Sequence, residues 1–75
     1  MIQVQAFARY RELLGFQLES FPLPDPPTVE GLLAQPRLEA LPREAMVAVN
    51  RAFATRETGI RDGDEVALMP PVSGG

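Results

Sequence analysis

The sequence contains no cysteine, no histidine, no tryptophan and no lysine. Without cysteine the chain can form neither a disulfide bond nor a thiolate nucleophile, and without histidine it lacks an imidazole base. The two absences together exclude a Cys/His zinc site. Most catalytic constellations are therefore missing. We expect the chain to have no catalytic side chains of its own, no metal site and no bound cofactor.

Long apolar runs and an excess of positive charge are also absent. No stretch approaches the ~18 apolar residues of a membrane-spanning helix. Residues 1–4 lack the basic and apolar segments that begin a secretion signal. The formal net charge of −3 argues against nucleic acid, because that partner needs a basic patch. We therefore expect a cytoplasmic protein with neither a membrane nor a nucleic acid as partner.

Alternating apolar residues predict the strands of one small domain. Ile2, Val4 and Ala6 alternate with polar residues, which is the period of a half-buried strand. In the third strand, Val47 and Val49 predict the buried face. The Asp62-Gly63 pair indicates a turn before the last strand. We expect strands at residues 2–8, 16–21, 46–50, 52–54 and 66–69, of which 16–21 is ambiguous.

Two helices are predicted between these strands. Helix formers at residues 9–15 end at Gly15, a residue suited to a left-handed C-cap. Thr28 can N-cap a second helix that runs to Pro36, in which Gly31 weakens helix formation by ~1 kcal/mol relative to alanine. Residues 37–45 form either a helical turn or an irregular connection.

The order of the elements predicts an α+β fold of the β-grasp (ubiquitin-like) type. A helical crossover allows the first and last long strands to pair in parallel at the centre of a mixed sheet. One crossover helix and further short helices accompany this sheet. We assign residues 1–69 to the domain and residues 70–75 to an extended tail that ends in Gly-Gly.

The tail has two parts with different physical properties. Pro70 and Pro71 fix φ near −65° and make a stiff spacer, and six extended residues reach at most roughly 20 Å. Gly74 and Gly75 have no Cβ, so they can enter a tunnel too narrow for side chains. The terminal carboxylate reacts only if a partner activates it. Two final glycines occur by chance in roughly 0.5% of chains, so a tail without function remains the alternative.

Three apolar residues do not fit the inward register of their strands. Phe7 is out of phase with Ile2 and Val4, Met69 is out of phase with the rest of the last strand, and Phe53 lies on a very short strand. An exposed apolar cluster commonly marks a docking site. Phe7, Phe53 and Met69 are therefore predicted to contact partners. The alternative is that a bulge turns Phe7 inward, or that these residues close one end of the core.

Several polar residues are explained by turns of the chain rather than by a binding site. Asp62, Asp64 and Glu65 lack the further oxygen ligands of a calcium loop and fit a solvated turn better. Asn50 is expected to satisfy a turn through its side chain. All seven basic residues are arginine. An activated C-terminus could therefore not attack side-chain amines of this chain, although an arginine-biased genome explains the composition equally well.

Four segments together resemble the small, sulfur-carrying subunit of molybdopterin synthase, in the MoaD/ThiS-type ubiquitin-like family. The segments are residues 8–15 (ARYRELLG), 28–32 (TVEGL), 48–50 (AVN) and 62–75 (DGDEVALMPPVSGG). The resemblance covers nearly the whole chain, and the last segment is its most specific part.

This resemblance implies that an ATP-dependent adenylating enzyme activates the Gly75 carboxylate. A sulfur donor then replaces AMP and leaves a C-terminal thiocarboxylate. In a heterotetrameric synthase, the large subunit takes up the tail and passes the sulfur to a cyclic pyranopterin precursor. A dithiolene contains two sulfur atoms, so two loaded carriers are used for each product. The resemblance makes Gly75 the reacting residue and Gly74 the residue that must fit the tunnel. The other tail residues in partner contact would be Pro70, Pro71, Val72 and Ser73.

Three other functions remain open from the sequence. A sulfur carrier for thiamine biosynthesis would share the fold and the Gly-Gly end, but the segment before the two glycines in such carriers resembles residues 70–73 less well. A β-grasp binding module would use the same fold without tail chemistry. A ubiquitin-like conjugator would join Gly75 to lysines of other proteins.

Overall fold

The computed structural model describes residues 1–71 of the chain. Secondary structure begins with β1 (Ile2–Ala6), α1 (Arg9–Leu14) and β2 (Leu18–Phe21). The crossover contains α2 (Val29–Leu33) and the 3-10 helix η1 (Pro36–Leu38). The chain then forms β3 (Met46–Val49), β4 (Ala52–Ala54) and β5 (Glu65–Met69).

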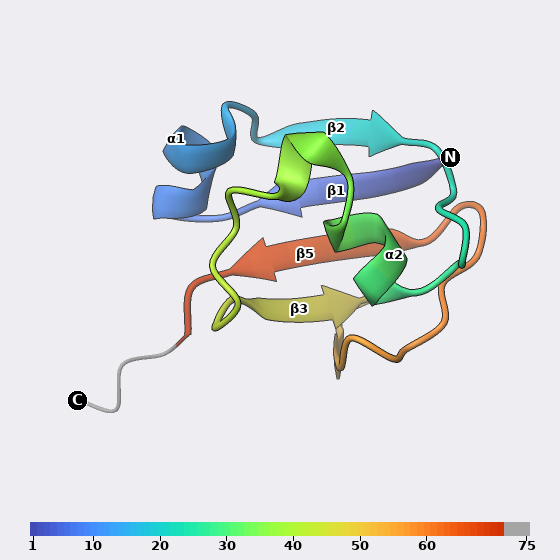
Figure 1. The fold of residues 1–75 in the computed structure, drawn as a ribbon. Helices are drawn as coiled ribbons and strands as arrows, with labels where there is room; N and C mark the ends of the chain where they lie inside the picture. The colour runs from blue at the N-terminus through green and yellow to red at the C-terminus, as the bar shows by residue number, and fades with distance from the viewer. Residues whose placement is uncertain (72–75) are drawn as a thin grey trace.

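The strands form one mixed sheet in the order β2-β1-β5-β3-β4. The central pair, β1 and β5, is parallel, and every other neighbouring pair is antiparallel. Figure 1 shows α2 and the turn of η1 across one face of the sheet, with α1 beyond the carboxyl end of β1. The predicted β-grasp fold, with parallel strands at its centre, is confirmed.

The core lies between the helices and one face of the sheet. Ile2, Val4 and Ala6 of β1 point into it together with Val66 and Leu68 of β5, as the alternation predicts. The helical side of the core consists of Tyr10, Val29, Leu32, Leu33 and Leu38. Within residues 1–71, no helix lies on the opposite face of the sheet, which we call the open face.

The caps of both α-helices agree with the sequence prediction. Gly15 is left-handed, with φ of 84°, and its N–H donates to the carbonyl oxygen of Arg11 at 2.9 Å. The hydroxyl oxygen of Thr28 accepts a hydrogen bond of 3.0 Å from the N–H of Gly31. Gly31 has a second role, because a Cβ at this position would lie 2.2 Å from the carbonyl oxygen of Pro26.

Some predicted strand boundaries were wrong. β1 ends at Ala6 instead of residue 8, because Ala8 takes a positive φ of 53° that no regular strand allows. β2 includes only Leu18–Phe21 of the predicted residues 16–21. The predicted inward face of β3 is confirmed, since Val47 is buried and the half-buried Val49 packs against the core. On the open face, Ala48 is also buried, between Phe53 of β4 and Ala67 of β5.

No helix within residues 1–71 is both long and apolar enough to cross a membrane.

Candidate functional site

The predicted tail follows directly on β5, the middle strand of the five-stranded sheet. Val66 and Leu68 anchor β5 in the core, and its backbone pairs with both β1 and β3. Pro70 and Pro71 come next and are half-buried. Val72, Ser73, Gly74 and Gly75 lie outside the described residues. The last strand therefore gives the tail a rigid starting point, which we call the tail root (Pro70 and Pro71).

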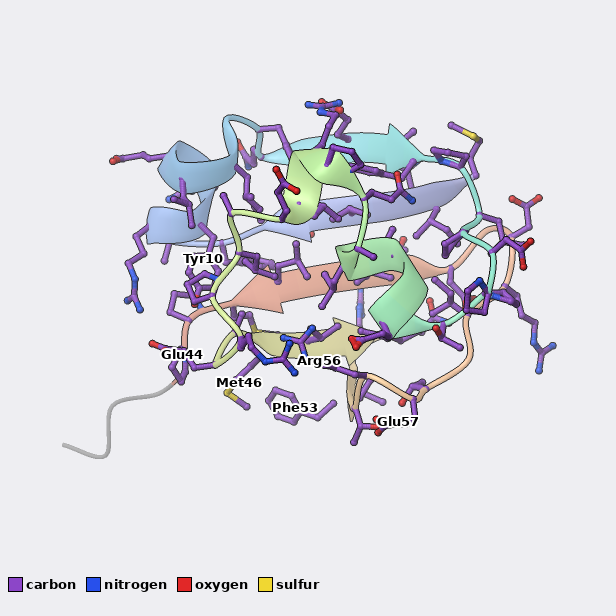
Figure 2. The ribbon with its side chains drawn as sticks, in the orientation of Figure 1. Tyr10, Glu44, Met46, Phe53, Arg56 and Glu57 are labelled. Carbon is purple, nitrogen blue, oxygen red and sulfur yellow. The ribbon has the colours of Figure 1, made fainter. Side chains whose placement is uncertain are left out.

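Two segments flank the tail root. Since β1 and β5 are parallel, α1, which follows β1, lies at the end of the sheet where β5 also ends (Figure 1). On the other side, Met46 pairs with Met69, so the residues just before β3 lie beside the chain as it leaves β5. Glu44, labelled in Figure 2, is one of these residues before β3. α1 and Pro42 together line a hollow of about 410 Å³.

Phe7 and Met69 lie on the open face, as the sequence predicted. Ala6 pairs with Leu68 in the parallel register, and the N–H of Phe7 donates to the carbonyl oxygen of Leu68 at 3.0 Å. The next residues in both chains, Phe7 and Met69, therefore point away from the core. The Phe7 side chain is 39% exposed, so no bulge turns it inward.

Phe53 lies on the same face, two strands away from Met69. Its partner in the sheet is Ala48, whose other neighbour is Ala67. Small alanine side chains thus separate Phe53 from the centre of the sheet. Phe53 is 72% exposed, the largest fraction among the exposed large apolar side chains of the described residues. The structure therefore places Phe7, Phe53 and Met69 on one surface, although their role in docking stays a prediction.

Two further apolar residues of this surface were missed by the sequence analysis. Leu18 of β2 is 60% exposed and pairs with Gln5 of β1, which puts it on the open face. Met46 is half-buried and pairs with Met69. Figure 2 shows the side chains of Met46 and Phe53 beside each other at the edge of the sheet. The open-face patch consists of Phe7, Leu18, Met46, Phe53 and Met69.

The open face changes character toward the start of β5. A groove of about 520 Å³ there has polar residues on its walls beside Phe7 and Leu18. The polar walls come from Gln3, Gln5, Arg51 and Glu65. A partner that covers the whole face would therefore meet apolar side chains near the tail root and hydrogen-bonding groups at the other end.

A hydrogen-bond network fixes the beginning of β5. The amide nitrogen Nδ2 of Asn50 donates to Oδ1 of Asp64 at 3.0 Å, and Oδ1 of Asn50 accepts from the N–H of Glu65 at 2.9 Å. The prediction that the Asn50 side chain satisfies a turn is confirmed, and the turn is the one that precedes β5. Asn50 and Arg51 themselves form the predicted turn between β3 and β4, with φ of 51° and 71°.

Asp64 is the centre of this network. Its Oδ2 accepts a hydrogen bond of 2.8 Å from the N–H of Arg61. The hydrogen bond from Asn50, followed by that from Arg61, lowers the pKa of Asp64 below its ordinary value. Asp62, in the same turn, pairs with the α-amino group of Met1 instead. The two carboxylates thus stabilise the turn through different partners.

The chain is similar to known proteins over nearly its whole length. The profile described as the ThiS family matches residues 4–75. The chain is 42% identical over 82 residues to the molybdopterin synthase sulfur carrier subunit of Escherichia coli, covering 100% of both chains. It is 37% identical over 81 residues to the subunit of that name from Chlamydomonas reinhardtii, covering 99% of this chain and 98% of the other.

Two solved structures with the same fold are similar in sequence as well. One is described as molybdopterin converting factor, subunit 1, from Pyrococcus furiosus, with a TM-score of 0.82, 28% identity and coverage of 95% of this chain and 97% of that chain. The other is SAMP1 from Haloferax volcanii, with a TM-score of 0.69, 29% identity and coverage of 99% and 98%.

Proposed function

Because this chain belongs to the ThiS family, we propose that it acts as the sulfur-carrier subunit of molybdopterin synthase. The observation that carries this proposal is the end-to-end likeness to relatives named as that subunit, at 42% identity with full coverage of both chains. The likeness includes the tail, since the family profile extends to residue 75. The expected relationship to this family is confirmed.

The proposed reaction begins at the Gly75 carboxylate, which is a poor electrophile by itself. An ATP-dependent adenylating enzyme joins it to AMP and releases pyrophosphate. Sulfur at the oxidation level of sulfide, released by its donor, then attacks the carbonyl carbon, the C–O bond to AMP breaks, and AMP leaves a thiocarboxylate behind. This chain contributes the reacting carboxyl group and its positioning, while the partners contribute acids, bases, ATP and the pterin contacts.

The large subunit of the synthase is the proposed recipient of the loaded tail. β5 is held on both edges, so the tail starts from a fixed place beside Phe7 and Met69. A partner that binds the open-face patch can therefore receive the tail in one orientation. Gly74 and Gly75 leave no side chain to obstruct a narrow tunnel. We propose that the adenylating enzyme uses the same surface, and that both encounters take place in the cytoplasm.

Intact-mass measurement tests the loading step. The carrier is incubated with ATP, a sulfur source and the cognate adenylating enzyme, beside a variant that lacks Gly75. We expect one carboxylate oxygen of the complete chain to be replaced by sulfur, and no change in the shortened chain. Equal sulfur incorporation into both would show that Gly75 is not the reacting residue.

The next step separates molybdopterin synthesis from thiamine synthesis. The loaded carrier is mixed with the large subunit of molybdopterin synthase and a cyclic pyranopterin precursor. We expect sulfur transfer to the pterin and return of the carrier to its carboxylate form. A loaded carrier that gives up no sulfur here, but serves a thiazole-forming partner, would favour the thiamine pathway.

A conjugating function is the second candidate. The likeness to SAMP1, at 29% identity, favours it, because the same protein is described as a small archaeal modifier. In that case, activation in a mixture of proteins would produce isopeptide bonds between Gly75 and foreign lysines. Peptide mapping for such bonds, beside the measurement of sulfur transfer, distinguishes the two functions.

A further inference from the structure

Three exposed arginines surround the end of the sheet from which the tail leaves. Arg9 and Arg11 lie on α1, beyond the carboxyl ends of β1 and β5 (Figure 1). Arg43 lines a hollow beside α2, and it lies only three residues before Met46, the partner of Met69 at the end of β5. Within residues 1–71, none of the three forms an ion pair with a carboxylate.

The structure fixes two of these arginines in position. The carbonyl oxygen of Arg43 accepts a hydrogen bond of 3.0 Å from Nη2 of Arg56, a half-buried residue. The guanidinium carbon of Arg9 lies 5.4 Å from the centre of the buried Tyr10 ring. The six residues from Pro70 onward reach at most roughly 20 Å. All three arginines are therefore within reach of an activated Gly75.

The α-amino group of Met1 is a primary amine at the other end of the molecule. It pairs with Asp62, while the N–H of Gly63 donates to the carbonyl oxygen of Met1 at 2.8 Å. Six residues of extended chain, or roughly 20 Å, separate Met1 from Phe7, which lies beside Met69. The tail could meet this amine only by turning back along the sheet at its full length.

We infer that arginine in place of lysine around the tail exit prevents the chain from being acylated by its own activated carboxyl group. This inference rests on the proposed function. A lysine amine would attack the carbonyl carbon of the adenylate, form an amide, expel AMP with the bonding electron pair and release a proton. A guanidinium stays protonated in proteins and has no free electron pair for this attack. The acceptor of the activated group is thus always a nucleophile supplied by a partner.

Single substitutions that preserve charge test the inference. Arg9→Lys and Arg43→Lys place an amine at the exit, and Arg61→Lys is the matched control near Met1. Wild type and all three variants are prepared with a thioester at Gly75, which needs no partner enzyme, and are followed by intact mass and peptide mapping. Attack by a lysine expels the thiol and gives an amide that is lighter by one water than the hydrolysed chain.

We expect Arg43→Lys and Arg9→Lys to form this internal amide, and wild type to hydrolyse only. An effective concentration in the millimolar range should make the exit lysines react about 100-fold faster than lysines of other molecules at 10 μM. Arg61→Lys should react at least about tenfold more slowly than Arg43→Lys. Self-acylation of wild type, or equal rates for Arg61→Lys and Arg43→Lys, would overturn the inference.

A parallel experiment uses ATP and the cognate adenylating enzyme without a sulfur donor. Pyrophosphate release together with an internal amide in Arg43→Lys, but not in wild type, supports the same inference under enzymatic activation. If no pyrophosphate is released from any variant, the proposed function fails, while the thioester experiment still decides whether the exit arginines prevent self-acylation.

Discussion

Phe7 lies beside Met69 on the open face because the parallel register of β1 and β5 continues one residue past Ala6. The hydrogen bond of 3.0 Å from the N–H of Phe7 to the carbonyl oxygen of Leu68 holds this arrangement. Pro70 follows immediately, so the apolar surface and the start of the tail belong to one rigid unit. A protein that takes up the tail must therefore come close to both side chains.

Phe53→Asp should weaken binding to the large subunit by roughly 30- to 1,000-fold, which corresponds to the loss of one interface hot spot. Phe53 is 72% exposed, so its replacement should leave the fold intact. Leu23→Asp is the matched control, because Leu23 is also an exposed apolar residue but lies in the loop before α2. Titration calorimetry with circular dichroism measures both effects. Equal affinities of the two variants would remove Phe53 from the docking surface.

Gly31→Ala should destabilise the protein by roughly 1–3 kcal/mol, although alanine favours a helix. The added Cβ would lie 2.2 Å from the carbonyl oxygen of Pro26, and backbone atoms cannot easily move away. Gly59→Ala is the control, since its Cβ would lie an ordinary 3.8 Å from the nearest atom, the carbonyl oxygen of Pro27. Urea unfolding compares them. A more stable Gly31→Ala variant would contradict the observed close approach.

Asp64 should make stability depend on pH in the acidic range. Its pKa is lowered in the folded state by the hydrogen bonds from Asn50 and Arg61. The carboxylate therefore stabilises the fold above its unfolded pKa of about 3.9, and this contribution is lost as the pH falls from there toward the lower folded pKa. The difference in free energy of unfolding between wild type and Asp64→Asn should be largest near pH 6 and shrink below about pH 4.

The same measurement on Asn50→Ala checks the cause of this pH dependence. The variant loses the donor to Asp64 and the acceptor for the N–H of Glu65, so it should be less stable by about 1–2 kcal/mol at neutral pH. Replacing Asp64 in the Asn50→Ala background should then cost less than in wild type. If Asp64→Asn lowered the free energy of unfolding equally in both backgrounds and at every pH, the charge of Asp64 would not be what stabilises the turn.

Tyr10→Phe should leave stability unchanged or raise it by up to about 1 kcal/mol. The Tyr10 side chain is fully buried, and within residues 1–71 its hydroxyl has no hydrogen-bond partner. Removing a buried polar group without a partner eliminates a desolvation cost. Tyr10→Ala should instead lose about 3–5 kcal/mol through the cavity it leaves. A loss above about 1 kcal/mol in Tyr10→Phe would mean that the hydroxyl is hydrogen-bonded in solution.

Local patterns were sufficient to predict most of the fold. The alternation of Ile2, Val4 and Ala6, the cap at Gly15 and the helical crossover each depend on neighbouring residues or on chain handedness. The outward orientation of Phe7 and Met69 could also be predicted. Side chains alternate between the two faces of a strand, and the other apolar residues of each strand already pointed to the core.

The missed features depend on contacts between distant parts of the chain. The partner of the Asn50 side chain was missed, because Asn50 and Asp64 come together only after β3 and β5 pair. The tight packing of Gly31 depends on the path of residues 24–27, which several prolines determine. Leu18 belongs to a strand of four residues, too short for its alternation to indicate which side faces the core. The residue type alone does not distinguish Asn50, Gly31 or Leu18 from the same residue types in ordinary turns, helices or strands.

The most direct test of the account is the intact mass of a Gly74→Val variant beside wild type after incubation with ATP, a sulfur source and the adenylating enzyme. Both should unfold at the same urea concentration, because the substitution lies beyond the last core residue, Leu68. Wild type should exchange one oxygen of Gly75 for sulfur, whereas the bulky variant should stay unloaded. Loading of the variant at the wild-type rate, or no loading of wild type, would contradict a carrier that works through its Gly-Gly end.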